Sequence, residues 1–350
     1  MIVFADGAAL LNGAMDDLRR VYAGARIVGC SIAGEIAAAQ VFDGSLVATA
    51  IRFDRTDVRG CVVDLAEPAD SAASGRELAD ALAGPGLSHV FVLSDGLAVN
   101  GSALVEGITS RLPEGVTVTG GLSGDGERFA ETSVVWDGRP RSGAIVGVGF
   151  YGDALRVGYG SLGGWDPFGP ERIITRSEGN VLYEMDGQSA LALYKTYLGE
   201  YASELPASGL RFPLALRRET TGDPVVRTIL AVDEEGQSLT FAGDVPEGHY
   251  ARLMKANFDR LIDGATGAAV ASQESLRNSR PELAILISCV GRKLVLQQRI
   301  EEEVEGVRDA LNGNPALAGF YSYGELAPFA KSGKCELHNQ TMTVTTLAES

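Results

Sequence analysis

The sequence has few cysteines, few histidines and no cluster of basic residues. Each of these shortages argues against certain classes of protein. The four cysteines form no C-x-x-C pair and stand at no zinc-binding spacing with the three histidines. The net charge is −16 and the lysines and arginines form no run, which argues against binding to nucleic acid or to an anionic membrane. No stretch approaches the roughly 18 consecutive apolar residues of a transmembrane helix. We therefore expect reduced, free cysteines and no membrane insertion.

The chain of 350 residues is too long for one ordinary hydrophobic core, so two domains are expected. Its first residues, MIVFADG, lack the positively charged segment that begins a secretory signal peptide, and we expect a cytoplasmic protein. Glycine is abundant, with 44 residues, whereas an average chain contains about 7% glycine. Because glycine suits backbone with positive φ or close approaches, we expect several loops lined by backbone.

Three segments of the chain share one order of elements: a strand, a turn of small residues, a helix and a second strand. Their first strands are IVFADG, FVLSDG and ILISCVG. Each is followed by a segment with the apolar periodicity of a helix and then by an apolar segment typical of a strand. The segments span residues 2–37, 91–127 and 285–327. A strand–helix–strand connection favours parallel pairing, and the next strand follows through a short loop. We therefore predict an α/β protein with mixed sheets flanked by helices.

Each unit ends on the pattern Gly-x-x-x-x-Gly-Glu, and a further apolar strand follows it. The pattern comprises Gly29 with Gly34 and Glu35, Gly121 with Gly126 and Glu127, and Gly319 with Gly324 and Glu325. The strands that follow cover residues 45–53, 143–150 and 340–348. The repeated unit is therefore strand–helix–strand–strand.

The predicted domains are residues 1–175, with two units, and residues 176–350, with the third unit and an inserted block. The boundary rests on WDPFGP, whose prolines and glycine break the pattern. Within the block we predict a helix over 186–205, a hairpin over 225–243 and a helix over 249–269 that ends near Gly264. In the third unit, the helix over 294–311 is amphipathic, and its acidic residues 301–303 are expected to face solvent.

Several motifs resemble the FIST (F-box and intracellular signal transduction) family. In the N-terminal half these are GCSIAGEI and SLVATAIRF. In the C-terminal half they are MDGQSALALYKTYLG, FPLAL, VVRTILAVDEEGQSLTFAGDVPEGH, ISCVGR, GFYSYGEL and ELHNQTMTV, in that family's order. The resemblance covers nearly the whole chain and implies a FIST N-like domain followed by a FIST C-like domain.

The resemblance implies a sensory module, because the family is thought to bind small ligands and is often fused to signalling outputs. A eukaryotic relative recognises substrates for a ubiquitin ligase, and some members are reported to carry haem. We expect no output domain within these residues, and the sequence as given starts at the first strand, without the leading helix usual in the family. We therefore expect a sensor that is not an enzyme and that signals through a separate protein.

The candidate site lies in the third unit, where the loop GFYSYGEL leaves the carboxyl end of a strand, a common ligand position in α/β sheets. Glycines expose backbone groups, tyrosines offer flat walls with hydroxyl groups, and the glutamate accepts hydrogen bonds. These groups suit a small polar metabolite, with an amino acid as one candidate. The predicted ligand-binding residues are Cys289, Arg292, Gly319, Tyr321, Ser322, Tyr323, Gly324, Glu325, His338 and Asn339. A secondary set comprises Ser31, Gly34, Glu35, Asp95 and Ser123.

Other interpretations of these residues remain open. The glutamates of the three turns can lock the fold, Arg292 can pair with Glu325 or another carboxylate, and His338 can belong to a network that holds the loop. A protein-docking scaffold without a small ligand is an alternative function. Haem binding is another alternative, although no C-x-x-C-H motif supports it and no cofactor is expected. The last alternative is an enzyme with Cys289 as nucleophile and His338 as base.

Overall fold

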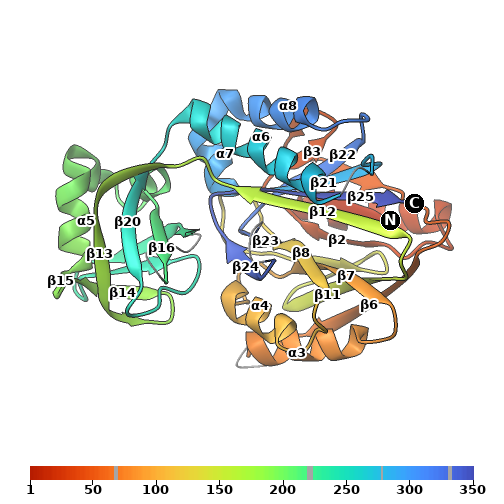
Figure 1. Ribbon diagram of the computed structural model, residues 1–350, viewed down its shortest axis with the longest axis horizontal. Coiled ribbons are helices and arrows are strands. Elements are labelled where there is room, and N and C mark those ends of the chain that lie inside the picture. The colour runs from red at the N-terminus through yellow and green to blue at the C-terminus, as the bar shows by residue number, and fades with distance from the viewer. Residues whose placement is uncertain (67–69, 219–223, 277–278, 330–332) are drawn as a thin grey trace.

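The computed structural model describes residues 1–66, 70–218, 224–276, 279–329 and 333–350. It consists of a large body and a smaller lobe, which lies at one end of the body (Figure 1). The lobe runs from β13 (Asp166–Glu178) to β20 (Tyr250–Lys255), and these two strands pair antiparallel where the chain enters and leaves it. Both chain termini lie at the far end of the body from the lobe (Figure 1). The lobe is therefore an insertion into the body.

The three predicted units are present in the body, and each contains one parallel pair and one antiparallel pair of strands. The parallel pairs are β1 (Ile2–Ala5) with β2 (Val28–Ser31), β7 (Leu87–Ser94) with β8 (Thr117–Leu122), and β21 (Leu283–Cys289) with β22 (Ala316–Ser322). The returning strands are β5 (Leu46–Thr49), β11 (Ala144–Tyr151) and β25 (Met342–Glu349). The prediction of mixed sheets flanked by helices is confirmed.

The hairpin that follows each turn pairs with a different unit from the one that supplies it. Strand β3 (Glu35–Ala37) of the first unit pairs with β22 of the third. Strand β23 (Gly324–Pro328) of the third unit pairs with β8 of the second, and β9 (Val134–Trp136) of the second pairs with β2 of the first. The outer strands of these hairpins are β4 (Gln40–Phe42), β24 (Cys335–His338) and β10 (Arg139–Arg141). The three units are thus interlocked in one body, and the boundary predicted at residue 175 falls within β13.

Because each unit pairs its hairpin with another unit, the body has three sheets with the same strand order. Sheet 2 has the order β24-β23-β8-β7-β11-β6 and sheet 3 has the matching order β4-β3-β22-β21-β25-β12, whereas sheet 1, β10-β9-β2-β1-β5, has no sixth strand. The sixth strands are β6 (Asp57–Asp64) and β12 (Leu155–Leu162). Sheet 1 is therefore the smallest of the three.

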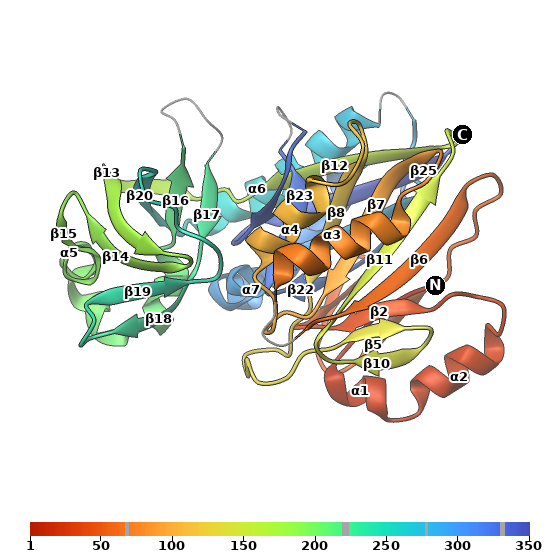
Figure 2. The ribbon, with the colours of Figure 1, turned by 90° about the horizontal axis from the view of Figure 1, so that it is seen from below.

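Each sheet turns one face to a shared inner core and the other to helices. Phe4, Phe91 and Ile285 lie in the inner core, whereas their neighbours on the opposite face pack in the cores beneath the helices. The helices are α1 (Gly7–Leu11), α2 (Ala14–Val21), α3 (Ser71–Leu82), α4 (Gly101–Thr109), α6 (Phe258–Ser275), α7 (Val290–Leu296) and α8 (Ile300–Ala310). Figure 2 shows α3 and α4 side by side on sheet 2. Burial on both faces explains the nearly continuous apolar runs of the strands.

The alignment of the second unit differs by one residue from the prediction. Gly29, Gly120 and Gly319 occupy equivalent positions, opposite Val3, Val92 and Leu286 of the adjacent parallel strand. The predicted Gly121 follows Gly120, the glycine that is equivalent in the structure. Gly126 and Glu127 therefore lie in the loop after β8 and are not equivalent to the Gly-Glu pairs of the other two units. Two successive glycines made the alignment ambiguous in the sequence.

The lobe contains one sheet that supports a helix. The sheet has the order β17-β16-β20-β13-β14-β19-β18, with β15 paired to β14. Its remaining strands are β14 (Val181–Met185), β15 (Gln188–Ser189), β16 (Leu214–Arg217), β17 (Val225–Arg227), β18 (Ile229–Asp233) and β19 (Ser238–Phe241). The predicted hairpin is confirmed in β18 and β19, which pair antiparallel. The helix predicted over 186–205 is α5 (Ala190–Leu198), followed by 3₁₀ turns.

The helix predicted over 249–269 is wrong in its first part, where the structure has β20. The following helix, α6, begins after Asn257, whose side chain accepts a hydrogen bond from the Arg260 amide, as N-cap residues do. It also continues past Gly264. A Cβ atom at Gly264 would lie 2.8 Å from the carbonyl carbon of Gly163, so this glycine permits close packing and does not end the helix.

Candidate functional site

The three turns that follow the parallel strands meet at the centre of the body. The Ala33 amide donates to the Tyr321 carbonyl over 2.8 Å, and the Tyr321 amide donates to the Gly34 carbonyl over 2.9 Å. The Gly124 amide donates to the Ser31 carbonyl over 3.0 Å, which joins the second turn to the first. Backbone hydrogen bonds thus interlock the three turns that end the repeated units.

Two of the three glutamates of the turns hold the fold together. Glu35 accepts hydrogen bonds from the amides of Ser45 and Asp6, and Glu325 accepts them from the Ser322 hydroxyl (2.6 Å) and the Thr341 hydroxyl (2.9 Å). Both side chains are buried, whereas Glu127 is exposed. The interpretation of these glutamates as fold-locking residues fits the contacts of Glu35 and Glu325.

In the second unit, Asp95 takes the place of the missing glutamate. Its carboxylate accepts a hydrogen bond from the Gly143 amide over 2.9 Å, just before the returning strand begins. Glu35 and Glu325 bind the equivalent amides of Ser45 and Thr341. Each unit therefore anchors its returning strand through an acidic side chain, although in the second unit this side chain, Asp95, comes from a different position of the repeat.

Burial raises the pKa of Glu325 to about 8, while the hydrogen bonds from Ser322 and Thr341 act in the opposite direction. In the folded protein this carboxyl keeps a proton that the unfolded chain releases above its ordinary pKa of 4.5. Its contribution to stability is therefore present in full below pH 4.5 and is lost as the pH rises through 8.

We expect Glu325 to lower the free energy of unfolding between pH 5 and pH 8, whereas the buried His89 and His338, whose pKa values are lowered to about 3 and about 4, raise it over part of the same range. Glu325→Gln is neutral at both pH values, so the wild type should lose stability relative to this variant between pH 5 and pH 8, which chemical denaturation of both proteins will measure. An equal change in wild type and variant would assign the pH dependence to other groups.

Arg292 belongs to a buried ion pair and does not reach a cavity. Its guanidinium contacts Glu303 over 2.7 Å, and both side chains have no exposed surface. The remaining donors of Arg292 bind the Gly163 and Leu261 carbonyls. The Tyr321 hydroxyl donates to the other carboxylate oxygen of Glu303 over 2.9 Å. The salt-bridge interpretation of Arg292 is confirmed, with Glu303 as the partner, and Tyr321 is part of the same network.

The expectation that the acidic residues 301–303 all face solvent is wrong for Glu303. The predicted continuous helix is interrupted at Gln297, whose φ is 49°. The second segment, α8, starts at Ile300 and turns Glu303 to the buried face with Val304 and Val307. A break in the helix changes which residues share a face, and no local signal at Gln297 revealed it.

A cavity of about 350 Å³ lies between the body and the lobe. The body contributes the carboxyl ends of β7 and β21 and the Tyr323 ring, and the lobe contributes its β18–β19 hairpin and the segment before β18. The lining residues are Gly96, Leu97, Ala98, Val99, Asn100, Leu122, Phe129, Asn180, Leu210, Thr228, Leu230, Phe241, Ala242, Gly243, Cys289, Val290, Gly291 and Tyr323. This is the position of ligands in open α/β sheets and at domain contacts, and it is our candidate site.

The lining of this cavity is mainly apolar, with a few polar groups. The Tyr323 ring stacks on Phe129 at a centroid distance of 4.5 Å, and its hydroxyl donates to the buried Asp125 carboxylate. Thr228 is 5% exposed, and its hydroxyl has no hydrogen-bond partner in the described part of the chain. A buried hydroxyl without a partner is costly, so Thr228 is the group best placed to bind a ligand.

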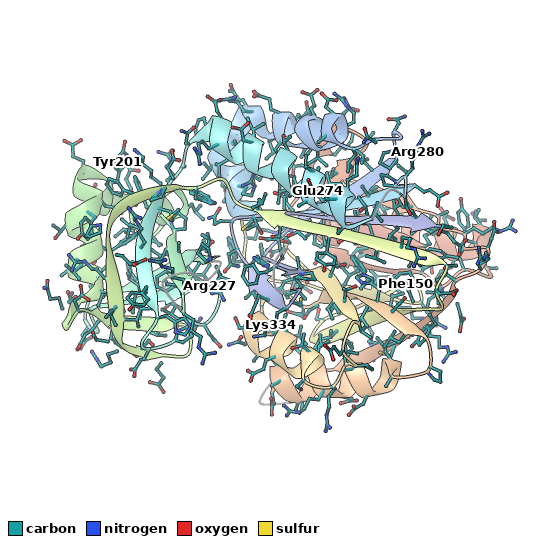
Figure 3. All side chains as sticks on the ribbon, in the orientation of Figure 1. Phe150, Tyr201, Arg227, Glu274, Arg280 and Lys334 are labelled. Carbon is teal, nitrogen blue, oxygen red and sulfur yellow. The ribbon has the colours of Figure 1, made fainter. Side chains whose placement is uncertain are left out.

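Arg227 lies beside the cavity, at the contact between lobe and body (Figure 3). Its side chain donates to the Leu337 carbonyl of β24 over 2.9 Å and to the Asp244 carbonyl over 3.1 Å. Among the described residues no carboxylate pairs with it, and burial lowers its pKa to about 10. A Cβ atom on the cavity residue Gly243 would lie 2.9 Å from its Nε. Arg227 thus joins the two parts and places a positive charge behind the cavity wall.

Two of the ten residues predicted for the main site, Cys289 and Tyr323, line the cavity. Ser322, Gly324, His338 and Asn339 are buried in the body, and both polar atoms of the Asn339 side chain lack a partner among the described residues. In the secondary set, the Ser31 hydroxyl accepts a hydrogen bond from the Ser133 amide, and Ser123 is buried.

The structure gives no support to a cysteine nucleophile. Burial raises the pKa of the Cys289 thiol, and the buried Glu325 carboxyl nearby raises it further. His338 has a pKa lowered to about 4 by burial, and its Nε2 lies 3.0 Å from the Ala327 carbonyl. The thiol and the imidazole do not form a hydrogen bond with each other.

The lobe residues Thr228, Leu230 and Phe241 were missing from the predicted site. The one signal in the sequence was a threonine inside the apolar run VVRTIL, which indicates a polar group in a buried strand. Among the described residues no group of three potential metal ligands occurs, and no helix of that part of the chain is long and apolar enough to cross a membrane.

Comparison with known proteins gave two family matches and one curated relative. The family described as the FIST N domain matches residues 1–188, and the family described as the FIST C domain matches residues 190–328. The uncharacterized protein MJ1623 of Methanocaldococcus jannaschii is 23% identical over 206 residues. The matched part is 55% of this chain and 39% of the relative, so the chain spans well under half the length of that protein.

Proposed function

Because the chain belongs to the FIST family, whose domains are associated with sensory signal transduction, we propose that it is a sensory protein with a small-molecule site. The ligand is a small polar metabolite, with amino acids as first candidates, and it binds in the cavity between body and lobe. The signal passes to a separate protein in the cytoplasm. The proposal involves no catalytic step.

The observation that carries the proposal is the Thr228 hydroxyl, which has no hydrogen-bond partner among the described residues and belongs to the wall of a mainly apolar cavity. A ligand group that bonds this hydroxyl gains a hydrogen bond at a position where water is excluded. Phe129, Phe241 and Leu230 offer an apolar surface for the rest of the molecule. The positive charge of Arg227 behind the wall favours a ligand with a carboxylate.

A ligand in this cavity would contact both parts of the molecule and so affect how they pack. Among the described residues, a small number of direct hydrogen bonds join them near the cavity. Arg227 donates to the Leu337 carbonyl and Asn100 to Asp244 over 2.8 Å, and longer bonds run from Gln340 to the Leu210 carbonyl (3.4 Å) and from the Asp244 amide to Ser102 (3.5 Å). We call the arrangement in which lobe and body pack together around the cavity the closed arrangement. A molecule that contacts both Thr228 of the lobe and Tyr323 of the body binds this arrangement more tightly than one in which the two parts separate, and so favours it. A partner protein that recognises the closed arrangement would then respond to the ligand.

A thermal-shift screen of amino acids and related acids tests this function. A ligand present at 100 times its Kd adds roughly 2.7 kcal/mol to the free energy of unfolding, so the melting temperature rises. We expect Thr228→Val to weaken ligand affinity about tenfold, because the ligand loses one hydrogen bond, and so to reduce the rise in melting temperature. We expect Leu230→Trp, which fills the cavity, to abolish it.

Ile173→Trp is the matched control, because Ile173 is an exposed aliphatic residue of the same lobe outside the cavity. It should respond like the wild type. If no compound stabilises the wild type, or if Leu230→Trp responds fully, the cavity is not the sensory site and a docking scaffold becomes the better interpretation.

A further inference from the structure

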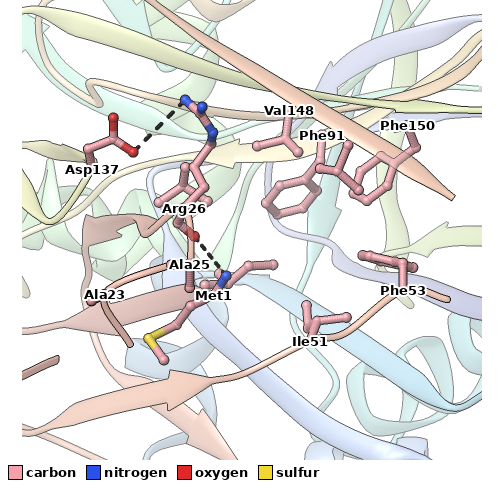
Figure 4. A pocket seen from close by; sticks show the side chains of 14 residues that line it. Met1, Ala23, Ala25, Arg26, Ile51, Phe53, Phe91, Asp137, Val148 and Phe150 are labelled. Carbon is pink, nitrogen blue, oxygen red and sulfur yellow. Dashed lines mark hydrogen bonds and ion pairs between the residues drawn. The ribbon is translucent and has the colours of Figure 1, made fainter. Parts of the chain in front are cut away.

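A second cavity of about 500 Å³ lies in the body (Figure 4). It is lined by the amino end of β1, by the loop before β2 and by side chains of β6, β7 and β11. The first cavity is instead lined by residues at the carboxyl ends of β7 and β21. The lining residues of the two cavities do not overlap, so they are separate sites.

The cavity exists because sheet 1 is shorter than its neighbours. Strands β1 and β5 have 4 residues each, whereas β7 and β11 have 8 residues each. The inner face of sheet 2 therefore extends beyond sheet 1, and Phe91, Val148 and Phe150 of this face line the cavity. Phe53 closes one side, with its ring at 5.6 Å from that of Phe150 in an edge-on arrangement. The result is a recess with aromatic and aliphatic walls.

One cationic side chain stands on the side of the recess that faces these rings. Figure 4 shows Arg26 opposite Phe53, Phe91 and Phe150. Its guanidinium lies over the Trp136 ring at 4.7 Å from the centroid. The nearest carboxylate is Asp137, at 3.9 Å, which exceeds hydrogen-bond distance. Within the described residues no hydrogen bond from this guanidinium is present, so its donors are available to a ligand.

We propose that this cavity binds a small amphipathic anion, with a carboxylate on Arg26 and an apolar tail among Phe53, Phe91, Val148 and Phe150. An apolar tail removes these side chains from water, which is favourable by about 25 cal/mol per Å² of buried apolar surface. A carboxylate matches the paired donors of a guanidinium and forms charge-assisted hydrogen bonds with it. Asp137 remains at the rim, and its negative charge opposes the binding of an anion. The preference for an anion is therefore weaker than it would be at an arginine without a nearby carboxylate.

The inference does not depend on the sensory proposal, since it concerns a different cavity and a different class of ligand. The sensory site has neutral polar groups in its wall, and the charge of Arg227 lies behind them. The second cavity has the Arg26 guanidinium and the Met1 ammonium in its wall, and its lining residues include no hydroxyl side chain. The two cavities therefore differ in whether a cationic side chain stands in the wall itself.

Calorimetric titration of the full chain with octanoate and with 1-octanol tests the proposal. The two probes share a tail, so their difference reports the carboxylate. We expect saturable binding of octanoate, about tenfold tighter than 1-octanol. Quenching or enhancement of Trp136 fluorescence should accompany it, because the indole lies beneath Arg26.

Arg26→Gln should weaken octanoate binding and bring its affinity closer to that of 1-octanol. Arg52→Gln is the matched control, because Arg52 is an exposed arginine of a neighbouring segment outside the cavity lining, and it should bind octanoate like the wild type. Ile51→Phe and Val148→Phe, which both enlarge side chains of the lining, should weaken both probes. Absence of saturable octanoate binding to the wild type, equal affinity for the two probes, or full octanoate affinity in Arg26→Gln would overturn the proposal.

Discussion

Replacing Glu303 with alanine is expected to lower the free energy of unfolding by about 3–5 kcal/mol, the usual cost of removing one partner of a buried ion pair. The Arg292 guanidinium has no exposed surface and would keep its charge without a counter-ion. Ser288 and Tyr321 would lose the carboxylate oxygen to which both hydroxyls donate. Chemical denaturation of the purified variant measures the change.

Glu302→Ala is the control, because this neighbouring glutamate pairs with Arg299 at the surface. An exposed pair contributes at most about 1 kcal/mol, so this variant should unfold almost like the wild type. Replacing both members, with Arg292→Met and Glu303→Leu, should recover part of the loss because no unpaired charge remains. Similar losses for Glu302→Ala and Glu303→Ala would show that Glu303 is not in a buried pair.

Gly319→Ala is expected to destabilise the protein by about 1–3 kcal/mol, the range for added atoms in a packed core, and more if the strands cannot separate. A Cβ atom at this position would lie 2.0 Å from the Leu286 carbonyl oxygen of the adjacent parallel strand. The equivalent glycines of the other units, Gly29 and Gly120, meet the corresponding carbonyl oxygens at 1.9 Å. The repeated glycine therefore permits a close approach of the two strands in every unit.

Gly24→Ala is the matched control, since a Cβ atom there would meet nothing within 4 Å. Its effect on the free energy of unfolding should be small and of either sign. Thermal or chemical unfolding of the two variants in parallel decides the question. If Gly319→Ala unfolds like Gly24→Ala, close strand approach is not the reason for this glycine.

The repeated unit could be predicted from the sequence because its signals are local. The apolar runs at β1, β7 and β21, the helical periods after them and the turns rich in glycine follow from residue type alone. The exchange of hairpins between units could not be predicted. Strand β3 carries no residue that specifies β22 as its partner, and pairing across hundreds of residues is decided by tertiary packing.

The candidate site could be predicted only in part for the same reason. Tyr323 and Cys289 follow strands of the third unit, and a ligand site at the carboxyl ends of such strands is a general property of α/β sheets. The lobe residue Thr228 reaches the site through the position of the whole insertion, which the sequence does not encode locally. The burial of Arg292 against Glu303 depends on the helix break at Gln297. Because no local signal revealed that break, Arg292 was wrongly predicted to face the site.

Hydrogen exchange with and without the most stabilising molecule from the screen tests most directly whether one ligand contacts both parts of the protein. Protection is expected in the body loop 96–100 and in strand β18 of the lobe, which both line the cavity. The hairpin of β14 and β15 lies outside the lining and should exchange as before. Protection confined to one part, or centred away from residues 96–100 and 228–230, would contradict a ligand site between body and lobe.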